Sequence, residues 1–297
     1  MVASLASILG GPQPPALLLG NGINRHRNND ENSSWERLLQ ILAERHGLQL
    51  TQDQLKEMSN TEFFDILDLA RPFDDRSNLQ RDFCDLMKSW QHNDHHGTLM
   101  SWAARRSAPV ITVNFDEMLS QAIGAAFIRT KSGFTDFYPW SSYFSTDSIG
   151  DARSSFAIWH AHGMAKYPRS IRLGLTHYMG SVERARRLIY GTGGLRSKAV
   201  TKPEDWKGAG TWLEPFFFCP IVVIGFAFGK DENFLRWLFL ERARLHRIKP
   251  DMKTDAWFVV KGAADDDHRR PFLERIGIKM IFVESYEEIY ENPAWKR

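Results

Sequence analysis

Short apolar runs alternate along the chain with longer segments whose apolar residues recur at helical spacing. Continuous apolar runs are typical of parallel strands that are buried on both sides, and the segments between them are long enough for helices. The pattern therefore predicts an α/β fold, with a mostly parallel sheet and helices on both of its faces. The expected strands are Ala16 to Leu19, Pro109 to Val113, Phe156 to His160, Ile221 to Ile224, Trp257 to Val260 and Lys279 to Val283.

A long helical stretch separates the first two expected strands. Between about residues 34 and 106, apolar residues recur at helical spacing, for example Trp35, Leu38 and Leu42. We interpret this stretch as several helices inserted beside the sheet. The 297 residues fit one large domain or two small ones, and we expect a single domain, residues 1–297, with this helical insertion.

Charge and cysteine content narrow the class of protein. The 38 Lys and Arg residues nearly balance the 36 Asp and Glu residues, and a net charge of +2 provides no global attraction for nucleic acid or an anionic membrane. Only Cys84 and Cys219 are present, which excludes a disulfide framework and a four-cysteine zinc site. No apolar run approaches the roughly 20 residues of a membrane helix, so we expect a soluble, cytoplasmic protein.

The first expected strand runs directly into Gly20-Asn21-Gly22-Ile23-Asn24. Two glycines would let the backbone turn sharply and approach a phosphate closely, and Arg25 and Arg27 could add charge-assisted hydrogen bonds. A tight strand-to-loop turn explains the same residues, and a lone Gly-x-Gly is a weak signal for nucleotide binding.

The second strand ends in Thr112-Val113-Asn114-Phe115-Asp116. Asn114 and Asp116 would lie just past the carboxyl end of a buried strand, where open α/β sheets bind ligands, and both could face one cavity. Capping of a helix that starts near Glu117 is the alternative, and it is favoured when this segment is taken alone.

The third strand ends in His160-Ala161-His162-Gly163. In extended chain the two imidazoles point to opposite faces, so one could act in catalysis while the other packs in the interior. A histidine can act as a general base near neutral pH, and a hydrogen-bonded structural role is the alternative for His160.

The fourth segment, Ile221 to Glu232, is an apolar strand followed by a glycine-flanked turn and an acidic helix start. Taken in order, Gly-x-Gly-Ile-Asn, Thr-x-Asn-Phe-Asp, His-Gly and Ile-Gly-Phe-x-Phe resemble the sirtuin-like family. The resemblance covers about Leu17 to Val260 and is closest to the sirtuin-like NAD hydrolases of bacterial antiphage defence. It implies a Rossmann-like fold with NAD lying across the strand ends.

The resemblance also implies roles for individual residues. Asn114 would position the nicotinamide ribose or the attacking water, Asp116 would hold the nicotinamide carboxamide, and His162 would be the base. Residues expected to contact NAD are Gly20, Asn21, Gly22, Ile23, Asn24, Thr112, Gly225 and Phe226.

Two departures from the family pattern affect the expected reaction. Deacetylating sirtuins carry a zinc module with two cysteine pairs, which two distant cysteines cannot build, so we expect no metal. Asn21 and Asn24 stand where sirtuins usually have a small residue and a serine. The resemblance therefore implies cleavage of NAD⁺ to nicotinamide and ADP-ribose with water as acceptor. An NAD- or ADP-ribose-binding regulatory module and a zinc-independent deacylase are the alternatives.

Uncontrolled NAD⁺ cleavage would kill the host, so the activity must be restrained. Since the predicted sheet and insertion use nearly all of the sequence, we expect control by homo-oligomerisation or by a protein partner, such as a HerA-like ATPase or an Argonaute-type protein.

Two further clusters are interpreted as structural. Gln91 to His96 contains metal-ligand residue types, but a solvated helix cap and loop is the favoured interpretation. Arg184, Arg186 and Arg187 are typical of a solvated helix face, so we expect no direct binding of nucleic acid.

Overall fold

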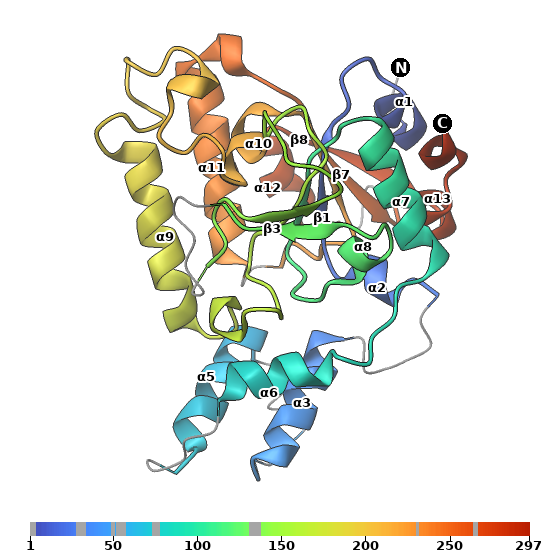
Figure 1. The fold of residues 1–297 in the computed structure, drawn as a ribbon, viewed down its shortest axis with the longest axis vertical. Coiled ribbons are helices and arrows are strands. Elements are labelled where there is room, and N and C mark those ends of the chain that lie inside the picture. Colours follow the sequence, from blue (N-terminus) through green and yellow to red (C-terminus); the bar gives the residue numbers. More distant parts are fainter. Residues whose placement is uncertain are drawn as a thin grey trace.

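The protein is built around one eight-stranded sheet (Figure 1). The computed structural model describes residues 4–27, 34–48, 51, 58–72, 78–130, 138–229, 232–263 and 267–297. The strands are β1 (Ala16–Leu19), β2 (Val110–Thr112), β3 (Ala126–Ile128), β4 (Tyr143–Ser145), β5 (Ile158–His160), β6 (Ile221–Ile224), β7 (Ala256–Lys261) and β8 (Ile278–Val283). The α-helices are α1 (Leu5–Leu9), α2 (Gly22–Arg25), α3 (Trp35–Arg45), α5 (Asn60–Ala70), α6 (Leu79–Leu86), α7 (Asp94–Arg105), α8 (Met118–Gln121), α9 (Leu175–Tyr190), α10 (Leu213–Phe218), α11 (Asn233–Ile248), α12 (Arg270–Arg275) and α13 (Glu287–Tyr290). Short 3₁₀ turns are η2 (Pro168–Ser170), η3 (Pro203–Asp205), η4 (Pro250–Met252) and η6 (Pro293–Lys296).

The strand order is β3-β4-β5-β2-β1-β6-β7-β8, and the six strands from β5 to β8 pair in parallel. These are the six strands that the apolar runs predict, each recovered within two residues of its expected ends. Strands β3 and β4 were not predicted; they pair antiparallel at one edge of the sheet. The predicted fold class, a Rossmann-like mostly parallel sheet with helices on both faces, is confirmed.

Successive side chains of each central strand pack into two different hydrophobic cores, one on each face of the sheet. Leu18 of β1 packs in a core that α9, α10, α11 and α12 cover, whereas Leu17 and Leu19 face a second core under α1, α7, α8 and α13. All three leucines are fully buried. Burial on both faces explains why these strands read as unbroken apolar runs rather than as alternating ones.

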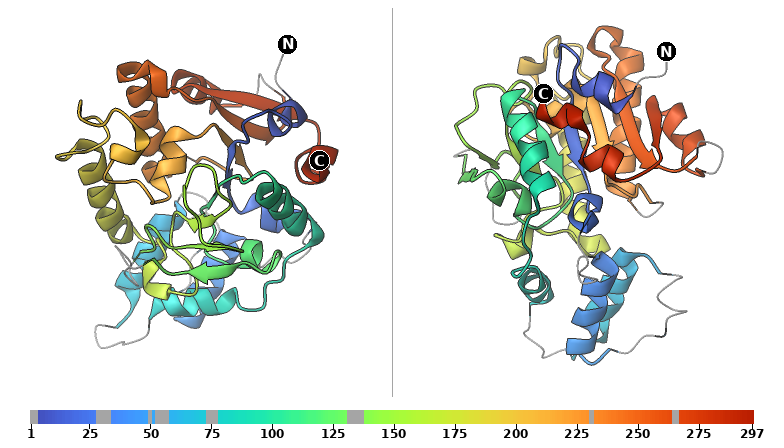
Figure 2. Two further views of the ribbon diagram at one scale, coloured as in Figure 1. Left: turned by 45° about the horizontal axis from the view of Figure 1, so that its top comes forward. Right: turned by 90° about the vertical axis from the view of Figure 1, so that its right-hand side faces the viewer.

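A third core lies at the end of the molecule that carries the carboxyl ends of the parallel strands (Figure 2). Helices α3, α5 and α6 build it together with Phe115 and Leu173, which belong to the segments after β2 and β5. Ser34, Ser59 and Asn78 cap these helices by accepting a hydrogen bond from the third residue of each. Helix α7, also within the predicted helical stretch, packs instead on the sheet. We refer to α3, α5 and α6 as the helical layer.

Candidate active site

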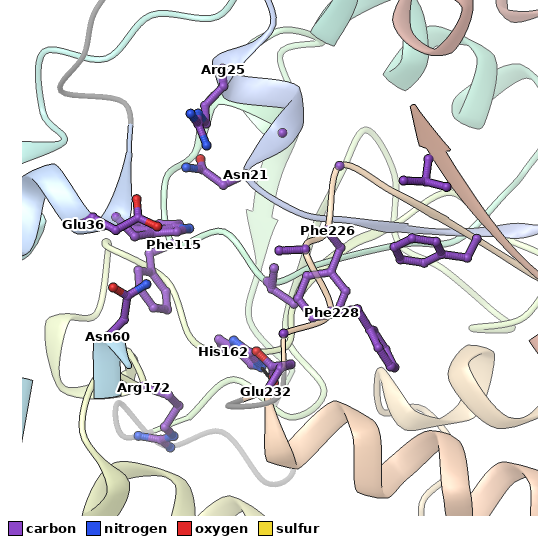
Figure 3. Close-up of a pocket in the computed structure, with 18 of the residues that line it drawn as sticks. Asn21, Arg25, Glu36, Asn60, Phe115, His162, Arg172, Phe226, Phe228 and Glu232 are labelled. Atoms are coloured by element: carbon purple, nitrogen blue, oxygen red, sulfur yellow. Dashed lines mark ion pairs between the residues drawn. The ribbon is translucent and has the colours of Figure 1, made fainter. Parts of the chain in front are cut away.

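A cavity of about 610 Å³ lies between the strand ends and the helical layer (Figure 3). Strand β1 lies between β2 and β6, so the chain leaves β1 toward one side and later returns on the other. Open α/β sheets bind ligands at such a switch point. The segments after β1, β2, β5 and β6 each contribute to the lining, which includes Asn21, Gly22, Arg25, Trp35, Val113, Phe115, His162, Arg172, Tyr178, Gly225, Phe226, Phe228 and Glu232.

The glycines after β1 and β6 allow two loops to cross in direct contact. The Gly20 amide donates to the Ile224 carbonyl at 2.9 Å, and the Gly22 amide donates to the Gly225 carbonyl at 2.7 Å. A Cβ on Gly20 would lie 2.5 Å from the Gly225 oxygen, and one on Gly22 would lie 2.6 Å from the Gly225 Cα. Gly225 itself has a φ of +65°. The glycines therefore satisfy a packing requirement of the protein itself, which phosphate binding alone would not explain.

We refer to residues 20–24, which follow β1, as the glycine turn. Behind this turn, a buried polar network joins the segments after β1 and β2. The Asn24 Nδ2 group donates to Asn21 Oδ1 at 2.9 Å and to Asp116 Oδ2 at 2.7 Å. Asn24 Oδ1 accepts from His96 Nε2 at 3.2 Å, while His96 Nδ1 accepts from the Asn93 amide at 3.1 Å. Burial lowers the pKa of His96 to about 3, so the ring is neutral with its proton on Nε2. Each amide and imidazole in the network thus has one orientation.

The cluster at residues 91–96 differs from the predicted solvated cap. His95 and His96 are buried, and His95 Nε2 donates to the Ile23 carbonyl at 2.7 Å. Burial lowers the pKa of His95, which favours the neutral ring that this hydrogen bond uses. The rest of the cluster matches the expectation, since Gln91, His92 and Asp94 are exposed and a helix starts after Asn93. The two histidines support the glycine turn from behind through their hydrogen bonds to Ile23 and Asn24.

Asn114 and Asp116 are both buried and face the glycine turn. Asn114 Nδ2 donates to the Gly20 carbonyl at 3.4 Å, and Asn114 Oδ1 has no partner among the described residues. Asp116 Oδ1 accepts from the Met118 amide, as the alternative capping interpretation predicts. Burial raises the pKa of Asp116 to about 6 against the hydrogen bonds from Met118 and Asn24. The cavity wall is formed instead by their neighbours Val113 and Phe115.

Thr112 of β2 links this strand to β1 next to Asn114. Its hydroxyl donates to the Leu19 carbonyl at 3.0 Å and accepts from the Asn114 amide at 3.1 Å. Thr112 is fully buried, so it supports Asn114 and the turn without reaching the cavity.

The two histidines after β5 separate as the alternation predicts. His160 is fully buried, and its Nδ1 donates to the Asn114 carbonyl at 2.8 Å. Burial lowers the pKa of His160 to about 4, which makes it a neutral structural group. His162 lines the cavity and meets the Tyr178 ring edge-on. Gly163 turns the chain with a φ of +92°, where a Cβ would lie 2.0 Å from the Ser170 oxygen.

Several cavity residues were not predicted from the sequence. Trp35, from the first turn of α3, stands edge-on to Phe115 and stacks on Phe83. Arg172 lies near the His162 end of the cavity (Figure 3). Glu232 approaches His162 from the start of α11, and the acidic helix start was the only signal for it. Lys230 and Asp231 of the same segment lie outside the described residues.

The two arginines after the glycine turn have different roles. Arg25 lines the cavity, whereas Arg27 donates from Nη2 to Glu291 Oε2 at 2.7 Å. His26, between them, is buried and contacts the same carboxylate, with 2.9 Å between His26 Nε2 and Glu291 Oε1. Arg25 is therefore the better placed of the two to meet an anionic ligand.

The described part of the chain also bears on metal sites and membrane spans. Among those residues, no group of three or more His, Cys, Asp and Glu side chains could hold a metal ion. Within the same part, no helix has the length and apolar character needed to cross a membrane.

Comparison with known proteins agrees with the strand-end site. The family described as SIR2-like domain matches residues 108–281, which is more than half of the chain and runs from β2 into β8. No curated protein matches the sequence. The match includes Asn114, His162 and Gly225 but not the glycine turn, which the structure brings against them. The chain therefore belongs to the SIR2-like family, and this domain indicates a protein that uses NAD.

Proposed function

We propose that the protein hydrolyses NAD⁺ to nicotinamide and ADP-ribose. The observation that carries this proposal is the convergence of four separate segments at one cavity. The glycine turn, Gly225 and His162 all line it, and Figure 3 shows Asn21 of the turn and His162 at separate places along it. A volume of about 610 Å³ falls in the range of small-molecule sites, which is about 300–1,000 Å³.

The cavity lining matches the parts of a dinucleotide. Aromatic rings from the helical layer and from the segment after β6, among them Trp35 and Phe226, offer flat apolar surface for a base. Arg25 lines the cavity next to Asn21 of the glycine turn, where its guanidinium can bind phosphate oxygens. Phe228 packs behind Phe226 and fixes its position.

The proposed chemistry breaks the bond between ribose C1′ and the nicotinamide nitrogen. The bonding electrons leave on nicotinamide and neutralise its ring, while positive charge develops on the ribose. Water forms the new bond to C1′ and gives one proton to His162, which later releases it to solvent. Asn114 Oδ1 is buried with no hydrogen-bond partner among the described residues, and Asn114 lies behind Val113 and Phe115 of the cavity wall. We propose that Oδ1 accepts a hydrogen bond from that water or from a ribose hydroxyl once NAD⁺ binding moves this wall aside.

The proposed role of Asp116 is to support the nicotinamide end of the site. In this arrangement its carboxylate lies behind Asn24 and Asn21, and Asn21 lines the cavity. Asp116 therefore acts on the carboxamide through these two amides.

Nicotinamide release from NAD⁺ by the purified chain tests the proposal. We expect His162→Ala and Asn114→Ala each to lose about 10²- to 10⁴-fold in rate while remaining folded. His92→Ala, an exposed histidine outside the cavity, is the matched control. His160→Ala should affect the rate of the folded fraction less than His162→Ala does. A folded His162→Ala protein that cleaves NAD⁺ at the parental rate contradicts the assignment.

The same assay separates the rival functions. NAD⁺ binding without nicotinamide release identifies a regulatory binding module. Release that requires an acylated peptide identifies a deacylase.

We further propose that the protein is a regulated effector of antiphage defence, acting by NAD⁺ depletion in the cytoplasm. The support for this role is the family resemblance together with the need to restrain such an activity. Control would come from homo-oligomerisation or from a protein partner such as a HerA-like ATPase or an Argonaute-type protein. Measuring nicotinamide release at several protein concentrations, with and without the products of neighbouring genes, tests both routes.

A further inference from the structure

The carboxylate of a second cavity residue, Glu232, lies next to the imidazole of His162. Glu232 Oε1 lies 3.3 Å from His162 Nε2. Both side chains are largely buried, with 5% of His162 and 16% of Glu232 exposed. They come from the segments after β5 and before α11, and they meet only because β5 and β6 end at the same edge of the sheet (Figure 3).

Within the described part of the chain, neither of the two facing atoms makes a hydrogen bond. His162 Nε2 and Glu232 Oε1 are buried without a hydrogen-bond partner among the described residues, so their contact at 3.3 Å needs only a small rotation to become a hydrogen bond. Glu232 occupies the N-cap position of α11, yet its side chain caps no amide of that helix. Helix capping therefore does not explain the glutamate at this position. The atom that its carboxylate does approach is Nε2 of His162.

The surroundings hold the ring in place for this contact. Tyr178 packs edge-on to the His162 ring at 5.4 Å between centroids, and Phe234, from the first turn of α11, lies at 6.5 Å. The His162 carbonyl also accepts from the Arg172 amide at 2.9 Å, which fixes the backbone at this point. Among the described residues, the rings of Tyr178 and Phe234 thus flank the imidazole, and the carboxylate of Glu232 faces it.

We propose that Glu232 is a positioning residue for His162. The carboxylate holds the tautomer in which Nε2 carries the proton, and Nδ1 then presents its lone pair to the water that attacks ribose C1′. When Nδ1 accepts the proton from that water, the carboxylate lies next to the imidazolium that forms. This inference rests on the proposed hydrolysis of NAD⁺ and adds to it a residue that no motif in the sequence indicates.

Substitutions at Glu232 and at a second glutamate of the same helix test the inference by kinetics. Glu232→Ala should lower kcat by roughly 10- to 100-fold and leave KM within about threefold, because the Glu232 carboxylate orients the base and does not bind the substrate. Glu232→Asp should recover part of the loss. The matched control is Glu241→Gln, since Glu241 is buried in α11 and pairs with Arg244 outside the cavity.

Nitrogen-15 spectra of the histidines provide a readout that does not depend on turnover. The His162 signals are assigned by their loss in His162→Gln, and their shifts report which nitrogen carries the proton. The wild type should show the proton on Nε2, and Glu232→Ala should show a mixture of tautomers. Should the alanine variant fail to fold, Glu232→Asp and Glu232→Gln supply the same comparison.

The outcomes separate this inference from the proposed function. Parental kcat in a folded Glu232→Ala protein overturns the role of Glu232 while NAD⁺ hydrolysis stands. If the wild type releases no nicotinamide under any of the conditions above, hydrolysis fails, and the spectra then decide about Glu232. Identical tautomers in the wild type and in Glu232→Ala would overturn the pairing in either case.

Discussion

Replacing Asp116 with asparagine measures the energetic effect of the buried carboxylate behind the glycine turn. The carboxylate accepts hydrogen bonds from Asn24 and Met118. An asparagine can still accept from Met118, but its Nδ2 group would then face the Asn24 Nδ2 group, and two donors would meet. Asn24 cannot rotate to relieve this clash, because the neutral His96 donates to its oxygen. The substitution therefore carries a pH-independent penalty of about 1–3 kcal/mol.

The pH dependence isolates the effect of the charge from that penalty. The pKa of Asp116 is about 6 in the folded protein, raised by burial above the ordinary 3.8. Because the folded pKa is raised, the stabilisation that Asp116 provides is fully present below pH 3.8 and is lost as the pH rises through 6. The contribution of Asp116 to the free energy of unfolding falls by about 3 kcal/mol in total, and about 2 kcal/mol of this loss occurs between pH 4 and pH 7. Relative to Asp116→Asn, the wild type should lose that amount over this interval.

Urea denaturation followed by tryptophan fluorescence can measure both proteins, since the chain has 10 tryptophans. The free energy of unfolding is determined at several pH values from 4 to 7 for the wild type and Asp116→Asn. Asp94→Asn, an exposed position at the start of α7, controls for the loss of one carboxylate from the overall charge. A difference between the wild type and Asp116→Asn that stays constant within about 0.5 kcal/mol would refute the reasoning.

Three further substitutions, one of them with a matched control, test the other parts of the site. Gly163→Ala should lower stability by about 3 kcal/mol or more and the melting temperature by several degrees, and an unchanged melting temperature would contradict the φ-based argument. His96→Leu should lower the free energy of unfolding by about 1–3 kcal/mol and weaken NAD⁺ binding measured by calorimetry. Lower stability with unchanged binding would show that the buried polar network does not contribute to NAD⁺ binding. Arg25→Ala should weaken NAD⁺ binding several-fold, with greater loss at low salt, while Arg27→Ala should not, because Arg27 already pairs with Glu291. Equal effects of the two would contradict the assignment of Arg25 to the cavity.

The parallel sheet could be predicted because its strands carry their own signal. Each of the six is an apolar run, since both faces of the sheet are covered. Strands β3 and β4 have three residues each and pair antiparallel at the edge, and β3 is partly exposed. So short a segment has no periodicity that distinguishes it from a loop, and only pairing with its neighbour makes it a strand.

The roles of individual residues in the site depend on tertiary contacts, which the sequence pattern does not reveal. The segments after the strands could be brought together from topology alone, because parallel strands end at one edge. Whether Asn114 faces the cavity or the glycine turn depends on the twist of the chain after β2, and the structure places it toward the turn. His95 and His96 looked solvated because their burial depends on Ile23 and Asn24, more than 70 residues earlier. Glu232 had no signal beyond the acidic start of its helix.

The ionised carboxylate at Asp116 lowers stability at neutral pH, so packing alone does not explain its presence. Strongly perturbed groups of this kind occur most often where a reaction needs them. In the proposed reaction, NAD⁺ would enter the site with its positive charge on the nicotinamide ring, and cleavage would move that charge to the ribose. A fixed negative charge therefore speeds cleavage only if it lies closer to ribose C1′ than to the ring, since equal stabilisation of both states lowers no barrier. For this reason the side of the glycine turn on which nicotinamide binds decides whether Asp116 contributes to the rate or only to affinity.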